Sequence, residues 1–298
     1  MPASPRVAVG ATLAAATLWG TSFLVNDEGL RSVGPATFVV LRFALAGTVV
    51  AAAALAMRRL RARFLRRPWF WGLVAANAAG FLLQSLAQTM TTPARTALFV
   101  NSSAFAVALL ERVLHKHRLG WRRWAALGVG VAGASLLIVG GDLGALRGGR
   151  LLGDGLALAS GLAWSVYFVM NRDRLAQEDP LSLTALTFAA TGLVLLPALV
   201  LDDAPLAVPP HAWWTVLYAG LVTTALAYGL WAYGLRTLRA TSSAVLLLVE
   251  ILVASVLSLA LGRDAFGPWE VAGAALLSGA VVAMSVLSAG DPAADHPV

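Results

Sequence analysis

The chain has 298 residues, of which 59% are hydrophobic and 12% charged, and it contains no cysteine. A soluble fold of this length cannot bury so much apolar surface, so the composition predicts a protein that lies in a lipid bilayer. Without cysteine, disulfide bonds and thiolate metal sites are excluded, and we expect no bound metal or cofactor. The net charge of +7 raises nucleic acid as a partner. However, the basic residues flank apolar segments and form no patch with interleaved aromatics, so we expect no nucleic-acid binding.

Ten apolar segments of the sequence are long enough to cross a bilayer. Each needs roughly 20 residues to span a hydrocarbon core ~30 Å thick. The segments are too long and too uniformly apolar for the strands of a membrane barrel, so we predict an all-α membrane protein. The expected helices lie near residues 7–26, 34–57, 69–90, 94–114, 123–140, 153–171, 181–201, 211–235, 241–261 and 268–288.

The first and sixth segments carry the same sequence pattern. LAAATLWGTSFLVN at 13–26 returns 145 positions later as LASGLAWSVYFVMN at 158–171, and the match pairs Trp19 with Trp164. Carried on to 35 positions, the two stretches share 11 identities. A repeat of this length indicates two structural halves. We expect one half over 1–145, a second over 146–290, and a short polar cytoplasmic tail over 291–298 that is disordered.

Lys and Arg are unevenly shared between the two sides of the predicted bundle. When alternate loops are assigned to opposite sides, 16 of the 22 basic residues lie on the side of the N-terminus and 5 on the other, and Arg42 lies within a span. Cytoplasmic loops carry the excess of Lys and Arg in membrane proteins. We therefore expect both termini in the cytoplasm and the chain integral to the plasma (bacterial inner) membrane.

The number of spans in each half predicts their relative orientation. Five is an odd number, so the second half crosses the membrane in the opposite sense to the first. The predicted fold is therefore ten transmembrane helices arranged as two inverted five-helix repeats. Inverted repeats with a site near the midplane between them are characteristic of secondary transporters.

Several stretches resemble a known family. They read LWGTSF at 18–23, VGPATFVVLRFALAG at 33–47, AWSVYFVMNR at 163–172 and AYGLRTLRATSSAVLLLVE at 232–250. Together with the ten spans, they are similar to EamA-type transporters of the drug/metabolite transporter superfamily, over nearly the whole chain. The resemblance implies a transporter, not an enzyme, that carries small polar metabolites, amino acids or drugs, often outward across the inner membrane.

The sequence departs from the family pattern at the ends of two helices. Ile251 follows Glu250, where the family usually has proline. The Gly-Glu pairs that often end the fourth and ninth helices read His115-Lys116 and Gly262-Arg263 here. The coupling and substrate of better-known members are therefore not carried over to this chain.

Glu250 is the first candidate for a functional residue. It lies about ten residues into the ninth span, which at ~1.5 Å per residue places it ~15 Å deep, at the midplane. A charge there costs at least ~2.5 kcal/mol on insertion scales, so such a group usually faces a polar cavity or a partner. Substrate contact and proton acceptance both stay open, as does a structural hydrogen bond to another helix.

Arg42 lies eight residues into the second span, roughly 12 Å below the outer surface. We expect it to be a gating or structural charge. Its long side chain can reach outward to water or pair with Asp27 or Glu28 at the outer end of the first span.

Aromatic and amide side chains complete the predicted site. Trp19 and Trp164 fall near mid-depth, where lining a cavity and packing between the halves are both open. Amides on the third helix share one face, which predicts either a cavity wall or interhelical hydrogen bonds. The expected substrate-binding residues are Glu250, Trp19, Trp164, Gln84, Gln88, Asn101 and Tyr228.

These observations favour a secondary transporter that moves small organic metabolites, amino acids or related compounds, as an exporter working by alternating access. Its expected partners are the small-molecule substrate, the lipid bilayer and, in one alternative, protons. Uptake and nucleotide-sugar-type exchange are the alternatives within the transporter class. An intramembrane transferase is the alternative from another class, but the clustered carboxylates or mid-span histidine that such chemistry needs are not found in the sequence.

Overall fold

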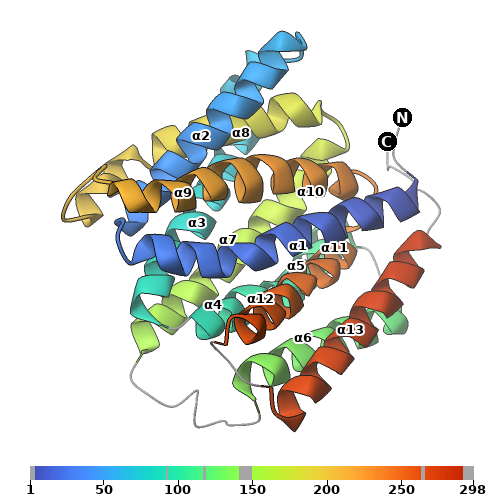
Figure 1. Ribbon diagram of the computed structural model, residues 1–298. Coiled ribbons are helices and arrows are strands. Elements are labelled where there is room, and N and C mark those ends of the chain that lie inside the picture. The colour runs from blue at the N-terminus through green and yellow to red at the C-terminus, as the bar shows by residue number, and fades with distance from the viewer. Residues whose placement is uncertain (1–3, 92, 117–118, 141–149, 263–265, 291–298) are drawn as a thin grey trace.

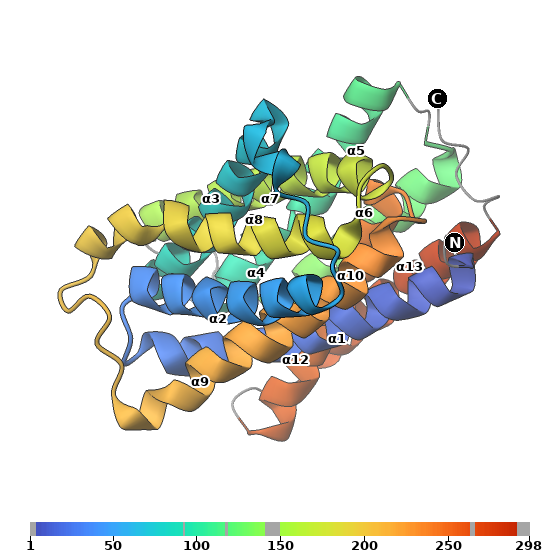
Figure 2. The same cartoon turned by 90° about the horizontal axis from the view of Figure 1, so that it is seen from above.

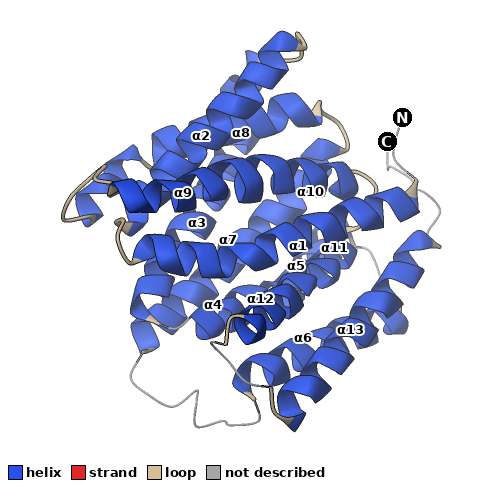
Figure 3. Cartoon of the chain, viewed as in Figure 1, coloured by secondary structure: helices blue, strands red, loops and turns tan. Residues whose placement is uncertain are grey.

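The computed structural model describes residues 4–91, 93–116, 119–140, 150–262 and 266–290. Every regular element within these ranges is helical, as Figure 3 shows. Nine helices of this part of the chain are long and apolar enough to cross a membrane, and a shorter apolar helix, α8 (Pro180–Val194), is the tenth. The predicted all-α membrane fold is confirmed. The expected division at 145–146 and the tail at 291–298 lie outside the described residues.

The helices follow the predicted segments closely. The first half comprises α1 (Pro5–Leu30), α2 (Pro35–Ala56), α3 (Pro68–Met90), α4 (Pro93–Asn101), α5 (Ser103–His115) and α6 (Trp121–Val139). The second comprises α7 (Leu151–Leu175), α8 (Pro180–Val194), α9 (Trp213–Leu217), a π-helical segment (Tyr218–Leu226), α10 (Ala227–Leu235), α11 (Ala240–Leu247), α12 (Val249–Ala260) and α13 (Pro268–Ala289). Short 3₁₀ helices occupy Ala62–Arg66, Leu196–Leu201 and Pro210–Ala212.

Four predicted spans are not single regular helices. The seventh ends at Val194 and continues as a 3₁₀ helix, because Pro197 has no N–H and its ring would clash with the preceding turn of an α-helix. The fourth is divided into α4 and α5 at Ser102, and the ninth into α11 and α12 at Leu248. In addition, the eighth span contains the π segment between α9 and α10.

The two halves interleave in space (Figures 1 and 2). α2 packs against α8, and α6 packs against α13. α1 packs against α10, and its counterpart α7 packs against α3 in the same way. Each of these contacts is retained when the two halves are exchanged, which is the pattern of two repeats related by a pseudo-two-fold axis. We call the end of the bundle that carries the start of α1 the N-terminal face, and the other end the opposite face.

The same hydrogen bond joins the halves at both faces. The backbone N–H of Leu206 donates to the hydroxyl of Thr37, at the start of α2, over 2.9 Å. The backbone N–H of Arg61 donates to the hydroxyl of Ser182, at the start of α8, over 2.7 Å. Both the donors and the acceptors are related by the 145-residue offset of the repeat. The loop that follows α8 is therefore bonded to the start of α2, and the loop that follows α2 is bonded to the start of α8.

Glycines allow α6 and α13 to approach closely. A Cβ atom on Gly133 would lie 2.6 Å from the backbone nitrogen of Leu277, and one on Gly273 would lie 2.8 Å from the carbonyl oxygen of Gly133. Neither backbone atom can move away without shifting a helix. In contrast, a Cβ on Gly128 of α6 or Gly279 of α13 would meet no atom within 4 Å.

We expect Gly133→Ala and Gly273→Ala to destabilise the protein by about 1–3 kcal/mol, because the added methyl group overpacks the crossing. Thermal unfolding in detergent should show a lower Tm for both variants. Gly128→Ala and Gly279→Ala, on the same two helices, should leave Tm unchanged or raise it, since alanine is the better helix former. If Gly273→Ala were as stable as Gly279→Ala, the close crossing would be wrong.

Candidate functional site

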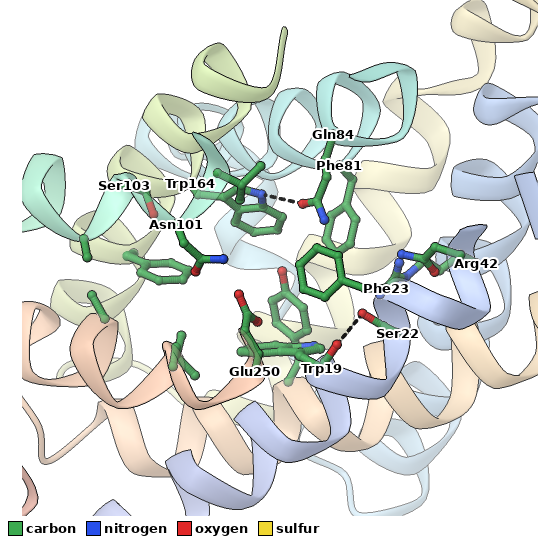
Figure 4. A pocket seen from close by; sticks show the side chains of 17 residues that line it. Trp19, Ser22, Phe23, Arg42, Phe81, Gln84, Asn101, Ser103, Trp164 and Glu250 are labelled. Atoms are coloured by element: carbon green, nitrogen blue, oxygen red, sulfur yellow. Dashed lines mark hydrogen bonds between the residues drawn. The ribbon is translucent and has the colours of Figure 1, made fainter. Parts of the chain in front are cut away.

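A cavity of about 80 Å³ lies in the middle of the bundle (Figure 4). This volume leaves room for several water molecules. Both halves contribute to its wall, so it lies at their interface. The lining residues are Trp19, Ser22, Phe23, Asn26, Arg42, Phe81, Gln84, Val100, Asn101, Ser103, Ala104, Trp164, Phe168, Tyr228, Ala244, Leu247 and Glu250.

The two divided helices border this cavity with matching kinks. Ser102 has φ −59° and ψ −17°, and Leu248 has φ −58° and ψ −15°. Beyond each kink the chain makes the same short-range hydrogen bond, from the N–H of Phe105 to Ser102 (3.1 Å) and from that of Ile251 to Leu248 (3.0 Å). Broken helices at the membrane midplane are a common way to build a polar site within a bundle.

Glu250 projects from the first turn of α12 into the cavity (Figure 4). The partial positive charge at a helix N-terminus favours a carboxylate at this position. Asn101, on α4, lines the same cavity, and its amide nitrogen donates to the backbone carbonyl of Ala97 over 3.0 Å. No described basic side chain forms an ion pair with Glu250. The structure thus brings together two residues of the predicted site.

Arg42 also lines the cavity and is only 3% exposed. Its Nε donates to the hydroxyl of Thr224, and its Nη2 donates to the hydroxyl of Thr223 over 3.1 Å. The guanidinium carbon lies 4.5 Å from the centroid of the Phe81 ring, within the range of a cation–π interaction. All of these partners are uncharged.

The expected pairing of Arg42 with Asp27 or Glu28 is not found. Both carboxylates instead pair with Arg31, at 2.9 Å and 3.7 Å, because Arg31 follows them by one helical turn and lies at the same surface. Arg42 therefore stays inside the bundle and reaches no surface charge.

The π segment of the eighth span holds both Arg42 and Trp19. The hydroxyls of Thr223 and Thr224 donate to the carbonyl of Ala219, over 3.1 Å and 2.7 Å, and their oxygens accept from Arg42. The indole N–H of Trp19 donates to the backbone carbonyl of Thr223 over 2.6 Å. Single π turns inside α-helices often occur at functional sites. Sequence reasoning missed these threonines, although two adjacent hydroxyls in an apolar span were a usable signal.

Aromatic rings form the floor of the cavity. Trp19 packs edge-on against Tyr228 with ring centroids 5.0 Å apart, and Trp164 packs edge-on against Phe81 at 4.7 Å. Trp231 is fully buried and packs against Trp19 and Tyr228, and its indole N–H donates to Ser243 over 2.9 Å. Three of the predicted aromatic residues, Trp19, Trp164 and Tyr228, thus border the cavity.

The two glutamines of the third helix have different positions. Gln84 lines the cavity and accepts a hydrogen bond from the indole N–H of Trp164 over 3.2 Å. Gln88 was expected to share this role, but the structure places it one turn further along α3 and outside the cavity wall. Its amide atoms are buried without a partner in the described part of the chain. Asn26, which was not predicted, lines the cavity instead.

On the N-terminal side the cavity is closed. α5 packs against α11, and the buried carboxylate of Glu111 accepts hydrogen bonds from the backbone N–H groups of Ala240 (3.2 Å) and Thr241 (3.0 Å). The hydroxyl of Thr241 donates to the same carboxylate. The repeat-equivalent helices on the opposite side, α4 and α12, make no comparable contact within their described residues. Within the described residues, the two halves therefore meet more closely on the N-terminal side of the cavity than on the opposite side.

A second, larger cavity of about 540 Å³ lies between α2, α8 and the eighth span. Its wall is mainly apolar, and several of its residues, such as Leu226 and Tyr233, are exposed on the outside of the bundle. It contains none of the predicted site residues, so we regard it as a lipid-facing groove. The described residues contain no group of three or more His, Asp or Glu side chains that could hold a metal ion.

Comparison with known proteins identifies one family, two relatives that are named as transporters or exporters, and one solved structure with the same fold. A model of the EamA-like transporter family matches residues 6–139 and 151–286. An uncharacterized transporter of Archaeoglobus fulgidus is 30% identical over 233 residues, which cover 76% of this chain and 80% of the relative. A probable terminal-alkyne amino-acid exporter of Streptantibioticus cattleyicolor is 27% identical over 274 residues, or 90% of each chain. A protein of known crystal structure has the same fold, with a TM-score of 0.79 at 23% identity, covering 94% of this chain and 97% of that one.

Single cysteines can test whether the cavity is open to water, since the chain has none of its own. We expect Ser22→Cys and Ser103→Cys, which line the cavity, to react with a small water-soluble methanethiosulfonate added from the opposite face. Ser160→Cys and Ser165→Cys are fully buried outside the cavity and should not react under the same conditions. Equal reaction at all four positions would rule out the described cavity.

Proposed function

The chain belongs to the EamA-like transporter family, and from this premise we propose that it exports small amino acids or related metabolites across the inner membrane by alternating access. The observation that carries the proposal is the cavity at the interface of the two halves. It combines a carboxylate, a guanidinium and several aromatic rings at mid-depth. Charged groups within a bundle usually mark a substrate or ion pathway.

The name of one relative supports the substrate class. The exporter of Streptantibioticus cattleyicolor matches this chain over almost its full length. An amino acid offers an ammonium, a carboxylate and a side chain, and the cavity offers a complementary group for each. A nucleotide sugar carries a diphosphate with two negative charges, but the cavity wall has a single basic side chain, Arg42, and a carboxylate, Glu250, so the cavity favours amino acids over that alternative.

The asymmetry between α5–α11 and α4–α12 supports alternating access. In a carrier built from two inverted repeats, exchanging the conformations of the halves moves the opening from one face to the other. Here α5 and α11 are in contact, and the described residues of α4 and α12 are not in comparable contact. We place the N-terminal face in the cytoplasm, because its loops carry the excess of basic residues. This conformation is then open toward the outside.

Purified protein in liposomes tests the proposal directly. Liposomes loaded with unlabelled L-norvaline should take up labelled L-norvaline by counterflow, and empty liposomes should not. Everted membrane vesicles should accumulate the amino acid, whereas right-side-out vesicles should lose it. If no small amino acid exchanges and a nucleotide sugar does, the proposed substrate class is wrong. Net accumulation in right-side-out vesicles would make it an uptake system.

Replacing Trp19 tests the aromatic floor. We expect Trp19→Ala to lower norvaline counterflow by roughly tenfold, the equivalent of about 1.4 kcal/mol, since it removes a cavity wall and the contact with the π segment. Trp269→Ala is the matched control, because Trp269 is 58% exposed at the bundle surface. It should transport as the wild type does. An equal loss in both variants would assign Trp19 no role beyond packing.

A further inference from the structure

The cavity contains one buried cation and one carboxylate that belong to different halves. No ion pair joins Arg42 of α2 to Glu250 of α12. We propose that the two residues bind the two charged groups of a zwitterionic α-amino acid. Arg42 binds the α-carboxylate, and Glu250 binds the α-ammonium. The inference rests on the proposed function and deepens it, because it names the substrate class and the residue for each charge.

The described contacts of the Arg42 guanidinium include no acidic side chain that would neutralise its charge. Guanidinium stays protonated in proteins, and a buried charge is costly unless a counter-charge or dense hydrogen bonding compensates for it. Around Arg42 the described partners are two hydroxyls and an aromatic ring. These contacts use Nε and one proton of Nη2, so Nη1 and the second proton of Nη2 remain for a ligand. The edge formed by Nη1 and Nη2 is one of the two edges of a guanidinium that can hold a carboxylate with two parallel hydrogen bonds.

The threonines also fix the direction of the guanidinium. Both hydroxyls are anchored to the Ala219 carbonyl and point their lone pairs at Arg42. The guanidinium is held against the π segment, and Arg42 lines the cavity (Figure 4). A preorganised donor pair loses little conformational entropy when it binds an anion.

Glu250 supplies the opposite charge on another wall. It faces the open space from α12, away from Arg42 in the view of Figure 4. An ammonium presents N–H donors only, so it requires acceptors, and a carboxylate gives it the strongest. Asn101 of α4 also lines the cavity, and an amide oxygen can accept a hydrogen bond from an ammonium. Because Glu250 and Asn101 flank the two kinks, ammonium binding would connect the elements that must move relative to each other.

The rest of the cavity wall is mainly apolar. Trp19, Trp164 and Tyr228 offer ring surface to the side chain of the substrate. Val100, Ala104 and Leu247 add aliphatic surface. The substrate class is therefore an α-amino acid with both charges and an apolar side chain.

Three matched probes test the two ends without any mutation. L-Norvaline has both charges, L-norvalinamide lacks the carboxylate, and pentanoate lacks the ammonium. In wild-type proteoliposomes, unlabelled norvaline should compete with labelled norvaline roughly 10- to 100-fold better than either analogue, since each analogue loses one charge-assisted bond. If norvaline exchanges but both analogues compete equally well, the zwitterion site is wrong and the proposed function stands. If norvaline does not exchange at all, the proposed function itself fails.

Two variants then assign the charges to their residues. Glu250→Gln should weaken norvaline and norvalinamide by roughly 10- to 100-fold but leave pentanoate unchanged. Arg42→Gln should weaken norvaline and pentanoate and leave norvalinamide unchanged. Glu28→Gln and Arg31→Gln, which carry the same substitutions in an exposed ion pair, should change none of the three.

Other outcomes overturn the assignment. If Glu250→Gln weakens all three probes equally, the carboxylate is structural. If it keeps norvaline counterflow but loses accumulation driven by a pH gradient, Glu250 moves protons and does not bind the ammonium. Should Arg42→Gln fail to fold, Arg42→Lys is the alternative variant. It keeps the positive charge but lacks the planar pair of N–H donors that binds a carboxylate with two hydrogen bonds. It should lose pentanoate affinity more than norvalinamide affinity, and an equal loss of both would contradict the proposal.

Discussion

The contact between Arg42 and the π segment of the eighth span joins the two halves at the depth where the membrane tolerates charge least. An arginine inside a bilayer needs an enclosed polar environment, and here Thr223, Thr224 and the face of Phe81 provide it. The same segment holds Trp19 through the carbonyl of Thr223. The π segment therefore holds both the Arg42 guanidinium and the Trp19 indole in position on the cavity wall.

The rest of the bundle largely follows the symmetry of the repeat. Equivalent hydrogen bonds at Thr37 and Ser182 tie the halves together at both faces. The kinks at Ser102 and Leu248 match to within a few degrees of backbone torsion. Among the described residues, the halves differ at the contact that Glu111 makes between α5 and α11, because α4 and α12 make no comparable contact. A scaffold of two inverted repeats that differ in this way has a second arrangement with the contact on the other side, and alternating access requires such a pair of arrangements.

The kinks explain how polar groups reach the midplane. Within a bilayer, backbone N–H and C=O groups must be satisfied inside the protein, so irregular backbone occurs only where it lines a cavity. Both kinks do so, and Glu250 lies in the first turn after one of them. There the helix N-terminus helps to offset the cost of the carboxylate. The tight glycine crossing of α6 and α13 lies elsewhere in the bundle and is independent of this arrangement.

The sequence by itself determined the helices, the two halves and the depth of the main candidates. These follow from hydropathy, the 145-residue repeat and the rise per residue, which are local properties of the chain. It placed Glu250, Trp19 and Trp164 near the midplane and named Gln84, Asn101 and Tyr228 as further substrate-binding candidates, and the structure places all six on one cavity. Only the tertiary structure decided which way each side chain faces. Gln88 was grouped with Gln84 because the two share a helix face, but the cavity wall ends one turn before Gln88. Depth does not report rotation about a helix axis, so Asn26 and Phe81 were missed. Likewise, Arg42 was expected to pair near the surface, because its true partners lie 181 and 182 residues away on a π-helical turn that no pattern of apolar residues reveals.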